Sequence, residues 1–340
     1  MSSLKIGIIG CGKQAEKHLS GLKKLPGLDF IVADIREEAS RSFCEKTSVT
    51  WAADLGDILE DRTVQAVVIC TPTRTHVELI REAVKAGKDV FCEKPLSGPN
   101  EELLELDSMV SGAGRIVMIG YVYRYVPILE EGHRLFRKLS VGASSLIMGE
   151  PLTAFFRLGG RGSHQAWKHR RATDGGAVNE MLVHMIDLAG WYFGPLKDVQ
   201  IVSRSLKLPQ RQINGDLVEA DAEDYVVVKC TGESGVEIIC QADLVTPAFS
   251  QYVEIQAENG SFMGSIQEDM PSYVFLKEGR GGYQAGRTEL RTGQRNLFDV
   301  QMLAFAEAVL KRQPPDRNSI ADSIQLMHIL QQVSAQVENK

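Results

Sequence analysis

A glycine-rich turn near the start of the chain constrains the fold more than any other feature. Residues 5–9 form a short apolar run typical of a buried parallel strand, and the run leads directly into the turn Gly10-Cys11-Gly12-Lys13-Gln14-Ala15. Residues 13–24 then carry Ala15, Leu19 and Leu22 at helical spacing. A strand, a G-x-G-x-x-A turn and a helix in this order are typical of a dinucleotide-binding fold.

The small residues of the turn have separate physical roles. Gly10 permits the tight turn, and Gly12 has no side chain to keep the backbone away from a pyrophosphate at the helix N-terminus. The next predicted strand ends at Asp34, about 20 residues further on, where such folds place the carboxylate that binds a ribose. We therefore expect the cofactor to contact Gly10, Cys11, Gly12, Lys13, Gln14, Asp34, Ile35 and Arg36.

Asp34 also bears on the choice of cofactor. Its carboxylate accepts hydrogen bonds from ribose hydroxyls and repels a 2′-phosphate, which favours NAD. Arg36 lies close enough to meet that phosphate, so NADP stays possible.

The length and composition limit the class of protein. A chain of 340 residues suggests two domains, and 44% hydrophobic with 24% charged residues is typical of a globular protein. The net charge of −6 argues against a nucleic-acid partner. The six cysteines show no C-x-x-C pairing, which indicates free thiols in a reducing compartment. With no room for a signal peptide and no apolar run of membrane-spanning length, we expect a cytoplasmic protein without a membrane partner.

The first third of the chain alternates between strand and helix patterns. Further strands are predicted at residues 64–70, 89–92 and 115–119, helices at residues 36–46, 76–86 and 100–110, and a turn at residues 54–60. Such alternation predicts a doubly wound parallel sheet, a Rossmann domain over residues 1–121.

The pattern changes after Gly120. Helices are predicted near residues 129–139 and 178–192, on either side of a loop rich in glycine and arginine at residues 159–176. Alternating stretches follow at residues 199–208, 224–230, 236–244, 252–257 and 261–266. Two helices, at residues 297–311 and 319–337, end the chain, and they are candidates for packing on the first domain. We expect residues 122–340 to form an α/β domain with a large open, mainly antiparallel sheet.

Two more motifs follow predicted strands of the first domain. In an open parallel sheet, ligands bind at the carboxyl ends of the strands, so residues 70–76 and the triplet Glu93-Lys94-Pro95 are candidate ligand contacts. Lys94 is the most informative of them, although a surface lysine in a loop is the simpler alternative. The expected cofactor contacts here are Cys70, Thr71, Pro72, Thr73, His76, Glu93 and Lys94.

The second domain has its own polar cluster. A helix starting near Gly176 would place Glu180, His184 and Asp187 on one face, at positions i, i+4 and i+7. A polar face on an apolar helix either meets water or lines a site. Glu180 and His184 have a spacing that suits a metal, but no third ligand follows at a sensible spacing, so we expect none. A hydrogen-bonded core histidine is the alternative for His184.

Together these motifs carry a resemblance to a known family. The turn at Gly10, Cys70-Thr71-Pro72 with His76, Glu93-Lys94-Pro95, and Gly175-Gly176 followed by His184 and Asp187 resemble the Gfo/Idh/MocA family of NAD(P)-dependent oxidoreductases. Gly120-Tyr121 with Arg124 and Pro127 fits the same family. The resemblance covers essentially the whole chain. It implies a Rossmann domain, a second α/β domain with a large open sheet, and a cis Lys94-Pro95 bond.

The resemblance also implies roles for individual residues. Lys94 and His184 match the catalytic lysine and histidine of the family, and Glu180 stands where many members have aspartate. Leu182 replaces a small residue and Tyr123 an arginine, so the substrate of better-known members is not carried over.

The reaction that this resemblance implies is hydride transfer between the nicotinamide and a secondary alcohol or ketone carbon of a sugar, sugar derivative or cyclitol. His184 would move the proton, Lys94 would polarise the oxygen, and Glu180 would orient His184 or accept a substrate hydroxyl. Because Lys94 and His184 belong to different domains, we expect the site in the cleft between them. The loop residues His164, Trp167, His169, Arg170 and Arg171 are further candidates, and for the arginines a solvated loop is the alternative. The expected substrate contacts are Lys94, Tyr123, Arg124, His164, Trp167, Arg170, Asn179, Glu180 and His184.

Two alternatives come from other functional classes. Some relatives use the cofactor for redox-assisted cleavage of a glycoside, and others are non-catalytic sensors of the cofactor. A sensor needs no acid/base pair, so Lys94 and His184 speak against it. The open sheet further predicts a homo-oligomer, a dimer or tetramer, because an exposed apolar sheet face tends to be covered.

Overall fold

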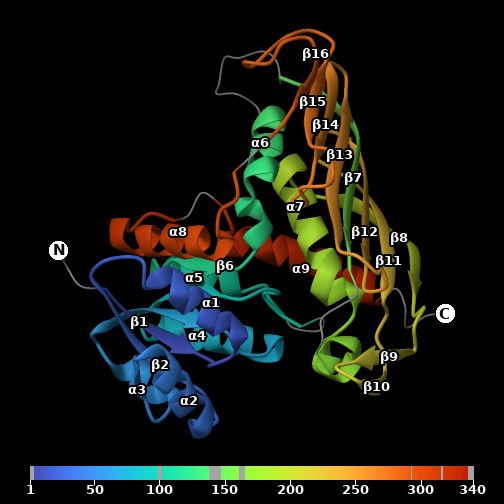
Figure 1. The fold of residues 1–340 in the computed structure, drawn as a ribbon. Helices are drawn as coiled ribbons and strands as arrows, with labels where there is room; N and C mark the ends of the chain where they lie inside the picture. Colours follow the sequence, from blue (N-terminus) through green and yellow to red (C-terminus); the bar gives the residue numbers. More distant parts are fainter. Residues whose placement is uncertain are drawn as a thin grey trace. The chain divides into compact units, whose positions relative to one another are not determined.

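The computed structural model describes residues 4–98, 102–137, 147–160, 165–291, 293–314 and 317–335 (Figure 1). The chain divides into two compact units. The first comprises Met1–Val122 and Arg295–Met327, and the second comprises Tyr123–Gln294 and His328–Lys340. The first unit is therefore discontinuous in sequence.

The first unit contains a six-stranded sheet in the order β3-β2-β1-β4-β5-β6, with all neighbours parallel. This order is the one that a Rossmann fold requires, and the predicted doubly wound sheet is confirmed. The strands are β1 (Leu4–Ile9), β2 (Leu28–Ala33), β3 (Thr50–Trp51), β4 (Val64–Ile69), β5 (Asp89–Cys92) and β6 (Val117–Ile119). Its helices are α1 (Lys13–Leu22), α2 (Glu37–Thr47), α3 (Leu55–Glu60), α4 (His76–Lys85), α5 (Leu106–Ala113) and α8 (Leu297–Lys311), with a 3₁₀ turn η1 (Thr73–Thr75).

Helices α1 and α8 approach closely because of a glycine. A Cβ added to Gly21 in α1 would lie 3.1 Å from the Cα of Asp299 in α8. Only a residue without a side chain allows this distance without a shift of the backbone. The contact joins the start of the chain to a helix close to its end.

Two predictions for the first unit are wrong. The predicted turn at residues 54–60 is the short helix α3, because Asp54 and Asp57 form a capping box that satisfies the first N–H groups of the helix. The helix predicted from residue 100 begins only at Leu106. A tight turn precedes it, in which the Leu106 N–H donates to the carbonyl oxygen of Leu103, a buried residue that anchors the loop.

The second unit contains an eight-stranded sheet in the order β16-β15-β14-β13-β7-β12-β11-β8. Among its described neighbours only β7 and β12 are parallel, so the large, mainly antiparallel sheet is confirmed as a mixed sheet. The strands are β7 (Pro151–Gly159), β8 (Lys197–Ser205), β11 (Tyr225–Thr231), β12 (Glu237–Asp243), β13 (Ser250–Ala257), β14 (Gly260–Gly264), β15 (Tyr273–Leu276) and β16 (Gly286–Glu289). β9 (Gln210–Ile213) and β10 (Asp216–Glu219) form a separate hairpin.

One face of this sheet packs against α6 (Pro127–Phe136) and α7 (Val183–Phe193) (Figure 1). Alternate residues of the strands are buried on that face, as in β11 and β13. The other strand residues stay partly exposed, among them the stacked rings of Phe155 and Tyr252, 5.8 Å apart, and Ile239 at 37% exposure. The 3₁₀ turns are η2 (Val122–Tyr125), η3 (Ala166–His169) and η4 (Arg171–Thr173), the π-helix is η5 (Val178–Leu182), and the last helix is α9 (Ile320–Ala335).

No helix in the described parts of the chain combines the length and hydrophobicity that crossing a membrane would require.

Candidate active site

The glycine turn after β1 leaves open space in front of helix α1. Gly10 has a φ of +92°, and a Cβ there would lie 2.8 Å from the carbonyl oxygen of Cys70, so the turn requires glycine. A Cβ on Gly12, the residue that precedes the first turn of α1, would meet no atom within 4 Å. The residues therefore fit a pyrophosphate, which would have both the free N–H groups of the helix and the room to reach them.

Asp34, directly after β2, is fixed by backbone donors. The Cys11 N–H donates to its Oδ2 at 2.9 Å and the Arg36 N–H donates to its Oδ1 at 2.9 Å. Burial raises the pKa of this carboxyl, but these hydrogen bonds and the Arg36 charge outweigh it, so the pKa is lowered and the group is ionised at neutral pH. Beside it the Ile35 side chain is fully exposed, as an adenine-packing residue would be before its ligand binds.

A buried histidine connects two loops at the same edge of the sheet. The His76 ring, 1% exposed, has Nδ1 2.8 Å from the Pro95 carbonyl oxygen and Nε2 2.9 Å from the Thr71 carbonyl oxygen. Burial lowers the pKa of His76, while the two hydrogen bonds act in the opposite direction. His76 thus ties the loop after β4 to the loop after β5. Direct contact of its side chain with the cofactor stays a prediction.

Lys94 lies in the loop after β5. The Lys94-Pro95 peptide bond is cis, as expected from the family resemblance. The preceding residue, Glu93, is buried, and its Oε1 lies 2.6 Å from Nε2 of His18 in α1. His18 was not predicted from the sequence as part of the site. The signal for it was present, because His18 falls on the same helical stripe as Ala15, Leu19 and Leu22 and is a polar residue on a buried face.

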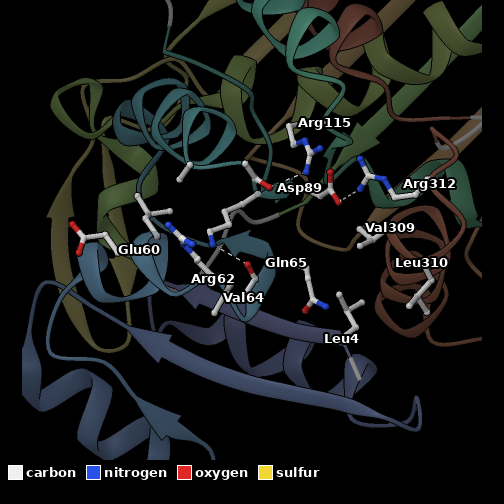
Figure 2. A pocket seen from close by; sticks show the side chains of 14 residues that line it. Leu4, Glu60, Arg62, Val64, Gln65, Asp89, Arg115, Val309, Leu310 and Arg312 are labelled. Atoms are coloured by element: carbon white, nitrogen blue, oxygen red, sulfur yellow. Dashed lines mark hydrogen bonds and ion pairs between the residues drawn. The ribbon is translucent and has the colours of Figure 1, made fainter. Parts of the chain in front are cut away.

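A hollow of about 610 Å³ lies at the opposite edge of the Rossmann sheet (Figure 2). Its walls include Leu4, Val64 and Asp89, each the first residue of its strand. Figure 2 shows Asp89 paired with Arg312, and other basic side chains there donate to backbone carbonyls: Lys88 to those of Asp61 and Val64, and Arg115 to that of Gly87. Because the hollow lies at the first residues of these strands, it is separate from the carboxyl-end edge that carries Gly10, Asp34 and Lys94.

In the second unit the segment with the predicted cluster begins as a π-helix. Gly176 has a φ of +110°, and the Ala177 and Val178 N–H groups donate to the carbonyl and carboxylate oxygens of Glu223. The regular helix predicted from Gly176 is therefore wrong for η5, and α-helical geometry begins at Val183. The wider turn has no signature in hydrophobic spacing, and π-turns are frequent at functional sites.

His184 lies in the first turn of α7 and is mostly buried. Its ring packs edge-on against the ring of Tyr123, with the centroids 4.8 Å apart. Burial raises the pKa of Tyr123 to about 12, so this phenol keeps its proton at neutral pH. Of the two neighbours, only the imidazole belongs to a class of side chain that exchanges protons near neutral pH.

Glu180 is paired with Lys168, a residue that was not predicted from the sequence as part of the site. Nζ of Lys168 lies 2.5 Å from Oε2 of Glu180, and the same ammonium lies 5.3 Å from the centre of the Trp167 ring. Trp167 is 45% exposed. Lys168 comes from η3, so the loop before the glycine pair folds back on η5. The signal in the sequence for Lys168 was its position next to Trp167, a predicted substrate contact.

Arg124 and Asp187 form a buried ion pair. Nη2 of Arg124 donates to Oδ1 of Asp187 at 2.8 Å, and Nε donates to both carboxylate oxygens. Both side chains are at most 5% exposed. The expectation that Asp187 shares an open polar face with Glu180 is not supported, because the Asp187 carboxylate is buried and paired with Arg124. A substrate contact of Arg124 stays a prediction.

The remaining predicted contacts within the described residues lie in η5 and in the segment before it. Arg170 and Arg171 are exposed, His169 is buried, and the Asn179 amide donates to the Asp174 carbonyl oxygen at 3.0 Å. His164 lies outside the described residues. Within the described ranges no group of three or more His, Cys, Asp or Glu side chains is arranged to hold a metal ion.

Comparison with known families decides the identity of both units. The sequence model of the Gfo/Idh/MocA oxidoreductase family with an NAD-binding Rossmann fold matches residues 4–121, and that of the family's C-terminal α/β domain matches residues 149–340. The chain belongs to the Gfo/Idh/MocA oxidoreductase family. Its first unit is the NAD-binding Rossmann domain of this oxidoreductase family.

Individual members of the Gfo/Idh/MocA family resemble most of the chain at low identity. A myo-inositol 2-dehydrogenase of Thermotoga maritima is 27% identical over 78% of this chain and 76% of its own length. A scyllo-inositol 2-dehydrogenase (NAD(+)) of Bacillus subtilis is 25% identical over 95% and 91%. The structure of a levoglucosan dehydrogenase in complex with NADH matches with a TM-score of 0.81 at 19% identity, covering 98% of this chain and 97% of that one. The last of these matches supports the fold alone.

Proposed function

We propose that the protein transfers a hydride between NAD and a secondary alcohol or ketone carbon of a cyclitol or sugar derivative. The inositol dehydrogenases among its relatives act on secondary ring alcohols, and the family to which the chain belongs shares the cofactor. The observation that carries the proposal lies in the first unit. The open space at Gly12, the ionised Asp34 and Lys94 all follow carboxyl ends of strands of one parallel sheet, so a cofactor over that edge would reach the lysine.

Different residues at this edge would bind different parts of NAD. The free N–H groups at the start of α1 would hold the pyrophosphate, Asp34 the adenosine ribose and Ile35 the adenine. When bound, the nicotinamide accepts or supplies the hydride. The protein therefore needs to orient the substrate carbon and move one proton.

Lys94 and His184 would handle the substrate oxygen. The lysine ammonium would stabilise negative charge that develops on that oxygen, and the imidazole would take or give its proton. Tyr123, which keeps its proton, would hold the imidazole edge-on. Glu180, held by Lys168, would accept a substrate hydroxyl or orient His184. Trp167, Arg170 and Asn179 remain the candidate contacts for further hydroxyls of the substrate.

The test is a panel of myo-inositol, scyllo-inositol, levoglucosan, neutral sugars and sugar acids, each incubated with NAD while NADH is followed. We expect reduction with at least one cyclitol or sugar, and a large loss of it in Lys94→Ala and His184→Ala. Measurable NAD binding without reduction by any of these compounds would contradict the proposal and favour a sensor. A released aglycone without accumulation of NADH would indicate glycoside cleavage instead.

We further propose a homo-oligomer in a reducing cytoplasm. The partly exposed face of the large sheet carries the stacked Phe155 and Tyr252 rings beside Ile239, an apolar surface that a second copy would cover. The six cysteines are free thiols, which suits a compartment that keeps thiols reduced.

A further inference from the structure

The first unit contains a buried polar pair beneath the loop that carries Lys94. The His18 ring is fully buried, edge-on to the rings of Phe91 at 4.9 Å and Phe298 at 5.5 Å. Its Nε2 lies 2.6 Å from Oε1 of Glu93, which is 7% exposed. The ring is thus set by two aromatic neighbours and directed at one carboxylate oxygen.

The other oxygen of Glu93 is bound to Lys94. The Lys94 N–H donates to Oε2 at 3.1 Å. Gly120 lies close to this oxygen, because a Cβ added there would lie 3.3 Å from Oε2, so a side chain at this position would crowd the carboxylate. The Glu93 N–H donates to the Ile69 carbonyl oxygen in β4 at 3.0 Å. The carboxylate therefore has one oxygen on helix α1 and the other on the main chain of the lysine.

The carboxylate of Glu93 is ionised although it is buried away from water. Burial raises the pKa of Glu93, but the hydrogen bond from His18 and the nearby positive charges outweigh this effect and lower the pKa. Hydrogen bonds to an ionised acceptor are about twice as strong as neutral ones. Loss of the His18 donor would leave a buried anion with fewer partners, a costly arrangement.

We propose that His18 is a positioning residue for Lys94: it fixes the Glu93 carboxylate, and that carboxylate fixes the main chain from which the lysine side chain extends. The inference rests on the proposed function, in which Lys94 acts on the substrate oxygen. A purely packing role would be served by an apolar side chain, which would fit between Phe91 and Phe298 without placing a polar ring in the core. The contact with Glu93 is the feature that an apolar side chain cannot supply.

Two substitutions separate the hydrogen bond from the packing. In His18→Gln the amide nitrogen can donate from nearly the position of Nε2, whereas His18→Leu keeps a similar volume and has no donor. On the substrate found with the panel, we expect His18→Leu to lower kcat by roughly 10- to 100-fold, because small misplacements of a catalytic group have effects of this size. His18→Gln should restore most of kcat. The Kd for NAD should stay within about threefold in both variants, since His18 is not among the residues expected to hold the adenosine half.

A second measurement needs no substrate. The protein is labelled with ¹⁵N-lysine, and the Lys94 amide signal is identified by its loss in Lys94→Arg. In the wild type and His18→Gln, this signal should keep its position between about pH 5.5 and 8.5, because Glu93 stays ionised. In His18→Leu, the pKa of Glu93 should rise into that range and the signal should move with pH. The other titratable groups around Glu93 are His76 of α4, Cys70 after β4, and Cys92 and Lys94 of its own segment.

Several results would overturn the inference. One is an unchanged kcat in His18→Leu, and another is an equal loss of kcat in His18→Leu and His18→Gln. A third is a Lys94 amide signal with the same pH dependence in the wild type and both variants. If His18→Leu does not fold, Glu93→Gln tests the pair from the other side: kcat should fall by a similar factor, and full turnover would refute the role. Absence of any substrate would reject the proposed function alone, because the amide titration still reports whether His18 controls Lys94.

Discussion

Asp34 is held so firmly by backbone N–H groups that its charge is a fixed feature of the cofactor edge. Asp34→Ser removes the carboxylate that would accept the ribose hydroxyls and repel a 2′-phosphate. We expect NAD affinity to fall about tenfold, the effect of one charged hydrogen bond, and NADP affinity to rise relative to NAD with the help of Arg36. Titration of both cofactors measures the ratio. Asp29→Ser, an exposed aspartate of β2, is the control, and an unchanged ratio in Asp34→Ser would refute the assignment.

His184 and Tyr123 pack ring to ring, but only one of them suits proton transfer at neutral pH. His184→Gln should lower kcat by on the order of 10²- to 10⁴-fold while NAD affinity changes little. Tyr123→Phe should retain most of the turnover, because burial raises the pKa of this phenol to about 12 and it does not release its proton. Steady-state kinetics of both variants decide the matter. A larger loss of kcat in Tyr123→Phe than in His184→Gln would assign the proton transfer to Tyr123 instead.

The residues that sequence reasoning missed at this scale share a property. The glycine turn, Asp34 and the Lys94 loop follow strand ends, and strand ends are visible as changes in hydrophobic pattern. His18 and Lys168 contribute through partners distant in sequence, Glu93 and Glu180. Sequence spacing does not show such pairs, because they form only when separate elements pack together.

Lys88 shows how a single cation can support the junction of several elements. Its ammonium is buried and donates to the carbonyl oxygens of Asp61 at 2.7 Å and Val64 at 2.9 Å, between α3 and β4. Lys88→Met keeps the stem and leaves both carbonyls without this donor. We expect a loss of about 1–3 kcal/mol in the free energy of unfolding, the cost of buried unsatisfied groups. Urea denaturation measures it, with exposed Lys85→Met as the matched control. Equal midpoints for the two variants would contradict the supporting role.

Elements with a strong periodic pattern were predicted well, and others were not. The structure gives α8 the predicted bounds, Leu297–Lys311, and its buried residues, among them Met302, Phe305 and Val309, recur at helical spacing. Strand β7, Pro151–Gly159, lies centrally in the large sheet and was not predicted, since its first residues interrupt the alternation with two exposed positions. The π-turn η5 was also missed, because it depends on Glu223 binding the first N–H groups.

At the scale of the whole molecule, the partly exposed face of the eight-stranded sheet predicts self-association. Ile239 of β12 lies beside Phe155 of β7 and opposite Lys229 of β11. Ile239→Glu would place a charge in the proposed interface, while Lys229 could pair with it in the isolated subunit. If a second copy buries more than about 1,000 Å² here, the wild type should be a dimer or tetramer and Ile239→Glu a smaller species by light scattering. Ile239→Val should leave the assembly intact. A monomeric wild type would rule the interface out.

The close approach of Gly21 in α1 to Asp299 in α8 has a consequence for how the first unit folds during its synthesis. A ribosome completes residues 4–122 long before it reaches α8, because residues 123–294 intervene. Until then the surface of α1 that faces α8 has no cover, and the aromatic ring of Phe298 that flanks His18 does not yet exist. The nascent first unit is therefore exposed to chaperones and proteases until the helix that follows residues 123–294 has been synthesised.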